Sequence, residues 1–175
     1  MPTRIQSKLI VSPQVEPVTV AEAKHYGLDA PDDVTIEKAI KAARELAESW
    51  TGRAFMEQTL RAVIYEVEAN EAIELPRPRL VEVLSVKDSD GNDIDSESYT
   101  TDIDCEPGLI QFSESHNKVV VEYKAATWGD VSDVPEYVKQ ALSKAAFLIH
   151  DNRASSGLPD VVRSDLFPLK ISFLG

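Results

Sequence analysis

Residues 32–52 read DDVTIEKAIKAARELAESWTG, and this stretch decides the fold of the chain. Asp32 and Asp33 stand before the first turn of a predicted helix, where carboxylates accept free backbone N–H groups. Gly52 follows the last turn and can adopt the left-handed conformation that ends a helix. Between them, apolar side chains recur at steps of four and three, which predicts a buried helix over 35–52. This apolar stripe contains Ile36, Ile40, Ala43, Ala47 and Trp50.

Two further helices are predicted on either side of this one. Upstream, Thr19 and Glu22 have the spacing of a capping box, in which each side chain accepts the other's backbone N–H, so a short helix begins there. Downstream, Asp133 and Glu136 repeat that spacing before a second periodic stretch, which predicts a long helix over 134–152. Its apolar stripe contains Val134, Val138, Ala141, Ala145 and Leu148, widened by Leu142 and Ile149.

Between the two long helices the period changes from helical to alternating. Short runs rich in β-branched and aromatic residues are separated by turn residues, and the run 88–92 (DSDGN) is typical of a hairpin turn. We therefore expect a small, mostly antiparallel β-subdomain over 57–128. Its predicted strands are Thr59–Val67, Ala72–Leu75, Leu80–Lys87, Tyr99–Asp102, Leu109–Phe112 and Lys118–Ala126.

The C-terminal stretch 160–175 is apolar but is interrupted by Pro168. Two alternatives are open: it folds back on the domain, or it is an extended tail that reaches a partner, as exposed apolar segments often do. Under the second alternative, residues 160–175 are dispensable for folding. The predicted fold class is α+β, a single domain over 1–175. It comprises N-terminal helices in 18–56, an inserted antiparallel β-subdomain in 57–128, a long helix in 133–153 and an extended C-terminal arm in 154–175.

Composition excludes several classes of function. Eighteen basic and thirty acidic residues give a net charge of −12, and no basic cluster offsets it, so the chain does not favour nucleic-acid binding. A single cysteine, Cys105, excludes an intramolecular disulfide framework and fits a reducing compartment. No apolar run is long enough to span a membrane, and the opening MPTRIQSKLIVSPQVEP lacks the pattern of a secretory signal.

The sequence contains no recognisable catalytic or metal-binding motif. The three histidines, His25, His116 and His150, lie far apart, and none has metal-ligand spacing to another ligand. The acidic run from Asp88 resembles the start of a calcium loop, but Gly91 and the residue at the twelfth position do not fit one. Acidic neighbours are expected to raise the pKa of Cys105 and make it unreactive. We predict no enzyme, no metal and no cofactor; a hydrolase using two carboxylates stays open.

The order of the motifs resembles the head–tail connector proteins (adaptor or head-completion proteins) of long-tailed bacteriophages. The resemblance begins with the run VEPVTVAEAK at 15–24 and covers nearly the whole chain. Its further pieces, in order, are Asp32-Asp33, Ile36–Ile40, AARELAE at 42–48 running into Thr51-Gly52-Arg53, LPRP at 75–78, Asp90-Gly91, Tyr123, Gly129-Asp130, Val134-Pro135-Glu136 and HDNR at 150–153.

This resemblance implies a structural virion protein of the phage neck with no catalytic activity. Family members form a ring, usually of twelve subunits, that lies beneath the portal, extends the DNA channel and carries the next neck or tail component. The implied partners are therefore further copies of the chain, the portal protein and a tail or stopper protein. Genomic DNA passes through the lumen without specific binding. The implied location is the virion, at the portal vertex of the capsid, after assembly in the host cytoplasm.

We assign three hypothetical roles on this basis. The two long helices form ring contacts, with Arg44, Glu45, Glu48 and Lys144 as candidate pairs across the subunit boundary. The C-terminal tail binds the portal through Leu166, Phe167, Leu169, Ile171 and Phe173. The hairpin loop containing Asp88, Asp90, Asn92 and Asp93 faces the tail side or the outer rim.

Two alternative functions remain at this point. In the first alternative, the chain is a neighbouring neck component, a stopper or tail terminator. The predicted β-subdomain favours this role, and the long helices do not. Otherwise it is a small cytoplasmic enzyme or ligand-binding module, which would be a monomer or dimer whose melting temperature depends on its ligand.

Overall fold

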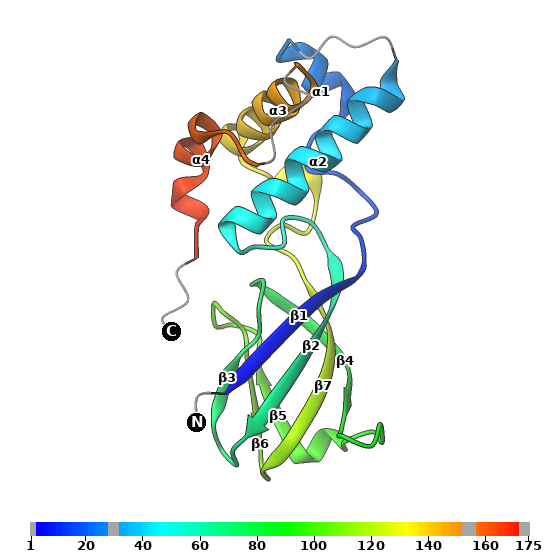
Figure 1. The fold of residues 1–175 in the computed structure, drawn as a ribbon, viewed down its shortest axis with the longest axis vertical. Helices are drawn as coiled ribbons and strands as arrows, with labels where there is room; N and C mark the ends of the chain where they lie inside the picture. The colour runs from blue at the N-terminus through cyan, green and yellow to red at the C-terminus, as the bar shows by residue number, and fades with distance from the viewer. Residues whose placement is uncertain (1–2, 28–31, 152–156, 172–175) are drawn as a thin grey trace. The chain divides into compact units, whose positions relative to one another are not determined.

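The computed structural model describes residues 3–27, 32–151 and 157–171, and its contacts divide the chain into two compact units (Figure 1). The β unit comprises residues 1–14 and 57–127, and the helical unit comprises 15–56 and 128–175. The chain therefore passes from one unit to the other at 14/15, 56/57 and 127/128. The mixture of helices and antiparallel sheets confirms the predicted α+β class.

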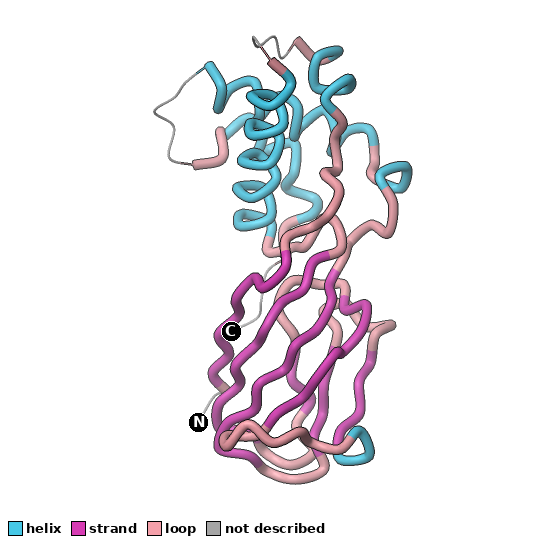
Figure 2. Tube along the Cα trace, turned by 90° about the vertical axis from the view of Figure 1, so that its right-hand side faces the viewer, coloured by secondary structure: helices cyan, strands magenta, loops and turns pink. Residues whose placement is uncertain are grey.

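The α-helices belong to the helical unit (Figure 2). They are α1 (Val20–His25), α2 (Asp33–Thr51), α3 (Glu136–Asp151) and α4 (Asp160–Leu166), with two 3-10 turns, η2 (Val131–Asp133) and η3 (Phe167–Leu169). Among the described residues, no helix has both the length and the apolar character needed to cross a bilayer.

Local sequence chemistry sets the ends of these helices. The Asp32 carboxylate accepts the Thr35 N–H at 2.7 Å, and Gly52 ends α2 in the left-handed conformation at φ 78°. Thr19 and Glu22 form the predicted capping box at the start of α1. Asp133 differs from its prediction: its carboxylate accepts the N–H of Asp130 and closes the turn of η2 instead of capping α3.

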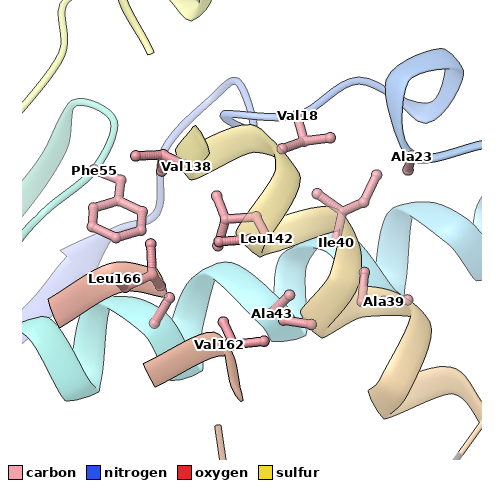
Figure 3. Packing of buried hydrophobic residues seen from close by; sticks show 14 of the residues in the cluster. Val18, Ala23, Ala39, Ile40, Ala43, Phe55, Val138, Leu142, Val162 and Leu166 are labelled. Carbon is pink, nitrogen blue, oxygen red and sulfur yellow. The ribbon is translucent and has the colours of Figure 1, made fainter. Parts of the chain in front are cut away.

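The core of the helical unit gathers the two predicted apolar stripes (Figure 3). Ile40 and Ala43 of α2 pack with Leu142 of α3 in this core. Small side chains on both helices are fully buried, which lets the helices approach closely; they are Ala43 and Ala47 of α2 and Ala145 and Ala146 of α3. Val162 and Leu166 of α4 are fully buried in the same cluster. The core therefore draws on segments from both ends of the chain.

The described part of the C-terminal stretch folds back on the domain, the first of the two alternatives. Ile171 N–H donates to the Thr51 carbonyl at 2.9 Å, and the Arg53 side chain donates to the Leu169 carbonyl at 2.6 Å. α4 contributes two fully buried side chains, Val162 and Leu166, so we expect that deletion of residues 160–175 destabilises the helical unit.

The β unit contains two antiparallel sheets. One has the order β1-β2-β7-β4 and the other β3-β6-β5. The strands are β1 (Arg4–Val11), β2 (Gln58–Val67), β3 (Ala72–Glu74), β4 (Leu80–Lys87), β5 (Tyr99–Asp102), β6 (Leu109–Phe112) and β7 (His116–Ala125), with a 3-10 turn η1 (Ser96–Ser98).

The alternation seen in the sequence places one face of each central strand in the core. In β7, Val119, Val121, Tyr123 and Ala125 are buried while the residues between them are partly exposed. All six predicted strands are present within one or two residues of their predicted ends. In the sequence, Ser7–Val11 (SKLIV) indicates only a short extended segment that ends before Pro13. In the structure, β1 pairs with β2 and extends the sheet.

Candidate functional site

The most unusual side chain of the helical unit is Arg44, which is 1% exposed on α2. Its Nε donates to the Glu16 carboxylate at 2.6 Å, and its Nη1 donates to the Glu48 carboxylate at 2.8 Å. Burial alone would lower the pKa of Arg44, but the two carboxylates raise it, so the guanidinium stays charged. A buried cation is stable only with such partners, so the three residues form one unit, the Arg44 cluster.

The Arg44 cluster and its neighbours lie where the chain enters and leaves the helical unit. Glu16 follows the 14/15 passage, and Glu48 accepts the N–H of Phe55 at 2.8 Å just before the 56/57 passage. Phe55 in turn accepts the Trp128 N–H at 3.0 Å, and their rings pack 5.2 Å apart, directly after the 127/128 passage. Close to each of these three passages, a residue is therefore held by hydrogen bonds inside the helical unit.

The four proposed ring-contact residues differ in burial. Arg44 and Glu48 are buried against each other inside their own protomer, so in this fold they have no surface to offer a second copy. Glu45 and Lys144 are exposed: Glu45 lies 3.9 Å from Arg44 Nη2, and Lys144 pairs with Asp165 at 3.1 Å. For these two a ring contact stays a prediction.

An apolar groove opens on the outer side of α2. It encloses about 570 Å³ between α2 and the segment that precedes α1. Val15 and Val34 are 52% and 55% exposed on it, and Glu37, Lys38 and Lys41 add charge. We call this surface the α2 groove.

A second groove is formed by α3, α4 and Tyr26, the residue that follows α1. It encloses about 500 Å³ and shares no residue with the α2 groove. Tyr137 and Phe147 are 44% and 40% exposed there, and the Lys144–Asp165 pair adds charge. We call this surface the α3 groove. Exposed aromatic side chains that are surrounded by polar groups are typical of protein interfaces.

Polar bonds hold α1 on α3 beside the α3 groove. Lys139 Nζ donates to Glu22 at 2.8 Å, and the Tyr26 hydroxyl donates to Glu136. Burial alone would raise the pKa of Glu22, but bonds from Lys139 and Thr19 lower it. The bond to Glu22 raises the pKa of Lys139. The position of α1 therefore depends on charged groups.

The hairpin loop of the β unit is closed by its own side chains. The Asp88 carboxylate accepts the side-chain amide of Asn92 at 3.1 Å and the backbone N–H groups of Asn92 and Asp90 at 2.9 and 2.8 Å, and these bonds lower the pKa of Asp88. Asp90, Asn92 and Asp93 are exposed and form a negatively charged tip. The tail-side role of this loop stays a prediction.

The proposed portal-binding residues differ in exposure. Leu166 is fully buried in the helical core and cannot contact another protein in this fold. Phe167 is 68% exposed, while Leu169 and Ile171 are partly exposed. Phe173 lies outside the described residues.

Reactive groups do not converge in the described part of the chain. Within residues 3–27, 32–151 and 157–171, no group of three or more His, Cys, Asp or Glu side chains has metal-binding geometry. A hydrogen bond to Asp102 raises the pKa of Cys105, in line with the expected low reactivity.

The sequence matches no protein-family model and no curated protein. The fold, in contrast, is similar to solved structures from gene transfer agent (GTA) particles. One is described as the neck of an empty GTA particle computed with C6 symmetry, and another as the virion of a native GTA particle. Each is 16% identical, with a TM-score of 0.76 over 97% of this chain and 98% of the other. A third, the neck of a native GTA particle computed with C12 symmetry, is 17% identical with a TM-score of 0.70 over the same shares.

Proposed function

We propose that the chain is a structural component of a phage-like neck, which forms a ring between the capsid portal and the tail or the next neck protein. The observation that carries the proposal is the fold similarity to neck proteins over 97% of this chain and 98% of theirs. Because both chains are covered almost completely, the similarity includes the β unit as well as the helical unit.

The surface of the helical unit supports a ring. A closed head-to-tail ring needs two different complementary surfaces on each subunit. The α2 groove and the α3 groove are separate, partly apolar and partly charged, as such surfaces must be. The C6 and C12 symmetries of the similar necks are symmetries of closed rings.

The charge of the chain suits a passage for DNA. Each copy contributes a net charge of −12, and repeated copies around a lumen repel phosphate. A lumen of this kind lets genomic DNA pass without binding it. The role proposed here requires no catalysis, and the described side chains supply positioning and adhesion.

Within this role, the C-terminal segment is the proposed contact with the portal. Phe167 is its most exposed apolar side chain, and Leu169 and Ile171 follow it on the surface. Glu45 and Lys144 are proposed to contact neighbouring copies. The acidic hairpin loop at Asp88–Asp93 is proposed to face the tail side or the outer rim.

Electron microscopy of the protein mixed with portal rings tests the proposal. We expect a second ring stacked on the portal, and Phe167→Ala should reduce its occupancy. Val161→Ala is the matched control, because Val161 is also exposed in the same segment but lies on the α4 helix. Portal rings that stay bare at saturating protein would contradict the proposal.

A stopper or tail-terminator role in the same neck is the second candidate. The observation that favours it is the size of the β unit, which takes residues 1–14 and 57–127. Cosedimentation separates the two roles: an adaptor pellets with portal rings, and a terminator pellets with tail tubes.

A further inference from the structure

The four-stranded sheet of the β unit ends in two open edges. In the order β1-β2-β7-β4, β1 and β4 are the edge strands, and each is eight residues long. Among the described residues, no strand pairs with the outer edge of β1. The outer edge of β4 is open over 80–85, since Asp93 bridges Lys87 and Ile94 donates to Val86 at 2.8 Å.

Both edges expose apolar side chains, which soluble proteins normally avoid on open strands. On β1, Leu9, Ile10 and Val11 are 39%, 39% and 47% exposed. On β4, Val81 and Leu84 are 40% and 46% exposed. The apolar residues lie near the C-terminal end of β1 and in the open part of β4. Open, apolar edge strands are templates for pairing with another chain.

The charge of β1 is opposite to that of the segment after β4, while β4 itself carries one acidic and one basic residue, Glu82 and Lys87. β1 carries Arg4 and Lys8 and no acidic residue, although the whole chain has a net charge of −12. The segment that follows β4 is strongly acidic and mostly exposed. Its carboxylates are Asp88, Asp90, Asp93, Asp95 and Glu97. Such complementarity favours contact between unlike edges over contact between like edges.

The directions of β1 and β4 allow their apolar parts and their oppositely charged parts to align at the same time. Each neighbouring pair in the sheet is antiparallel, so β1 and β4 also run in opposite directions. If a second copy continues the sheet, its β1 runs antiparallel to β4. The apolar end of β1 at Val11 then meets the start of β4 at Leu80. The basic end at Arg4 meets the acidic hairpin.

We propose that β1 of one copy pairs with the open edge of β4 of the next copy, so that the sheets of neighbouring subunits join. This inference rests on the ring of the proposed function and adds the strand contact that links its subunits. The contact joins two different edges, so it is heterologous and repeats around a closed ring. The occupant of each edge is therefore a second copy of this chain.

Cysteine cross-linking tests the pairing in the full-length protein. Ile10→Cys and Val81→Cys are introduced separately in a Cys105→Ser background, which removes the native thiol. Within one copy the two sites are separated by three strand spacings of about 4.8 Å each, roughly 14 Å in total. A disulfide requires Cα atoms within about 7 Å, so any cross-link between the two sites joins two copies.

The two variants are oxidised at high concentration, both alone and in the presence of portal rings. We expect a disulfide dimer when the two single variants are mixed, none with either alone, and a ladder of oligomers with the double variant. Equal dimer formation by one variant alone would overturn the proposal, because it indicates contact between like edges. Rings seen by electron microscopy without the mixed dimer would overturn it and leave the proposed function standing. Absence of both rings and dimer would count against the proposed function itself, and the pairing would fall with it.

Charge reversal supplies an independent readout. Arg4→Glu in the Ile10→Cys copy should reduce the yield of the mixed dimer, because Arg4 lies at the end of β1 that meets the acidic hairpin in this register. Lys118→Glu is the matched control, since Lys118 is on the central strand β7 of the same sheet and should leave the dimer unchanged. Asp90→Lys in the Val81→Cys copy should raise the yield again with Arg4→Glu. Equal yields with and without Arg4→Glu would contradict the electrostatic register.

Discussion

The interactions that stabilise the helical unit differ from those that stabilise the β unit. In the helical unit, four helices pack through small side chains, and ion pairs connect segments that are far apart in the sequence. In the β unit, backbone ladders join the strands, and the buried side chains are almost entirely apolar. Among the described residues, the buried charged side chains, Arg44 and Glu48, both belong to the helical unit.

The two units are therefore sensitive to different kinds of substitution. A backbone ladder spreads its stabilisation over many equivalent bonds, so a single side chain contributes mainly through packing. A buried ion cluster concentrates its stabilisation in a few atoms, because removing one partner leaves the others desolvated. We therefore expect charge deletions to affect the helical unit most, and cavity mutations to affect either unit.

Among the substitutions considered, Arg44→Ala should lower the stability of the helical unit most. It leaves two carboxylates next to a buried, vacated site, which costs about 3–5 kcal/mol. Both tryptophans, Trp50 and Trp128, are in the helical unit, so tryptophan emission during urea unfolding reports on that unit alone. We expect its transition to move to a much lower urea concentration.

Two controls sharpen the Arg44 result. Glu45→Ala removes the exposed neighbour and should change stability by no more than about 0.5 kcal/mol. Replacing Glu16, Arg44 and Glu48 together by apolar residues should cost less than Arg44→Ala, because no orphaned charge is left. If Arg44→Ala stays within about 1 kcal/mol of wild type, the cluster does not hold the helical unit.

Ile110→Ala is the corresponding deletion in the β unit. Ile110 is fully buried on β6, and its truncation should cost about 2–5 kcal/mol through the cavity it leaves. We expect the β-unit transition, followed by far-UV circular dichroism, to move to a lower urea concentration. The transition followed by tryptophan emission should keep its midpoint. Val81→Ala, exposed at a sheet edge, is the control. A common shift in both signals would show that the two units unfold together.

The secondary structure could be predicted from sequence because its signals are local. Helix caps at Thr19, Asp32 and Gly52 and the alternation of β7 act within a few residues, and each of these predictions is confirmed. β1 was recognised only as an extended segment, since its partner β2 begins at Gln58, far along the chain. Strand partners at such separations leave no local pattern.

The candidate site was harder to predict for the same reason. Arg44 and Glu48 have the spacing of an ordinary exposed i,i+4 pair on a helix, and only the position of Glu16 shows that the pair is buried. Ser143 is buried on α3 although it is polar and lies outside the predicted apolar stripe. The C-terminal helix α4 also depends on the core against which it packs, because Pro168 and its short length give a weak helical signal.

Thr19→Ala should have a smaller effect, confined to the helical unit. The Thr19 hydroxyl accepts the Glu22 N–H at 3.2 Å, and loss of this cap costs about 1 kcal/mol. Hydrogen exchange of the α1 amides should accelerate, while the β2 and β7 amides keep their protection. Thr100→Ala, an exposed threonine on β5, is the control and should leave α1 unchanged. Unaltered exchange in α1 after Thr19→Ala would contradict the cap.

The smallest expected effect is a pH dependence of the helical unit from Glu22. Because the pKa of Glu22 in the folded chain is below its ordinary value of 4.5, the unfolded chain binds the proton more readily. The stabilisation is therefore complete above about pH 4.5 and is lost as the pH falls through the folded pKa. Its size is about 1 kcal/mol or less, since the pair with Lys139 is partly exposed.

Glu22→Gln should therefore flatten the acid limb of stability followed by tryptophan emission, while the β-unit transition keeps its own pH profile. Lys139→Gln removes the partner and should weaken the same limb, and the double variant should resemble Glu22→Gln alone, because both changes remove one interaction. Additive effects of the two substitutions would mean that the acid dependence of the helical unit comes from other carboxylates. In that case the Glu22–Lys139 pair would belong with the exposed pairs of the β unit, such as Arg61–Glu122, as a contact of little consequence for stability.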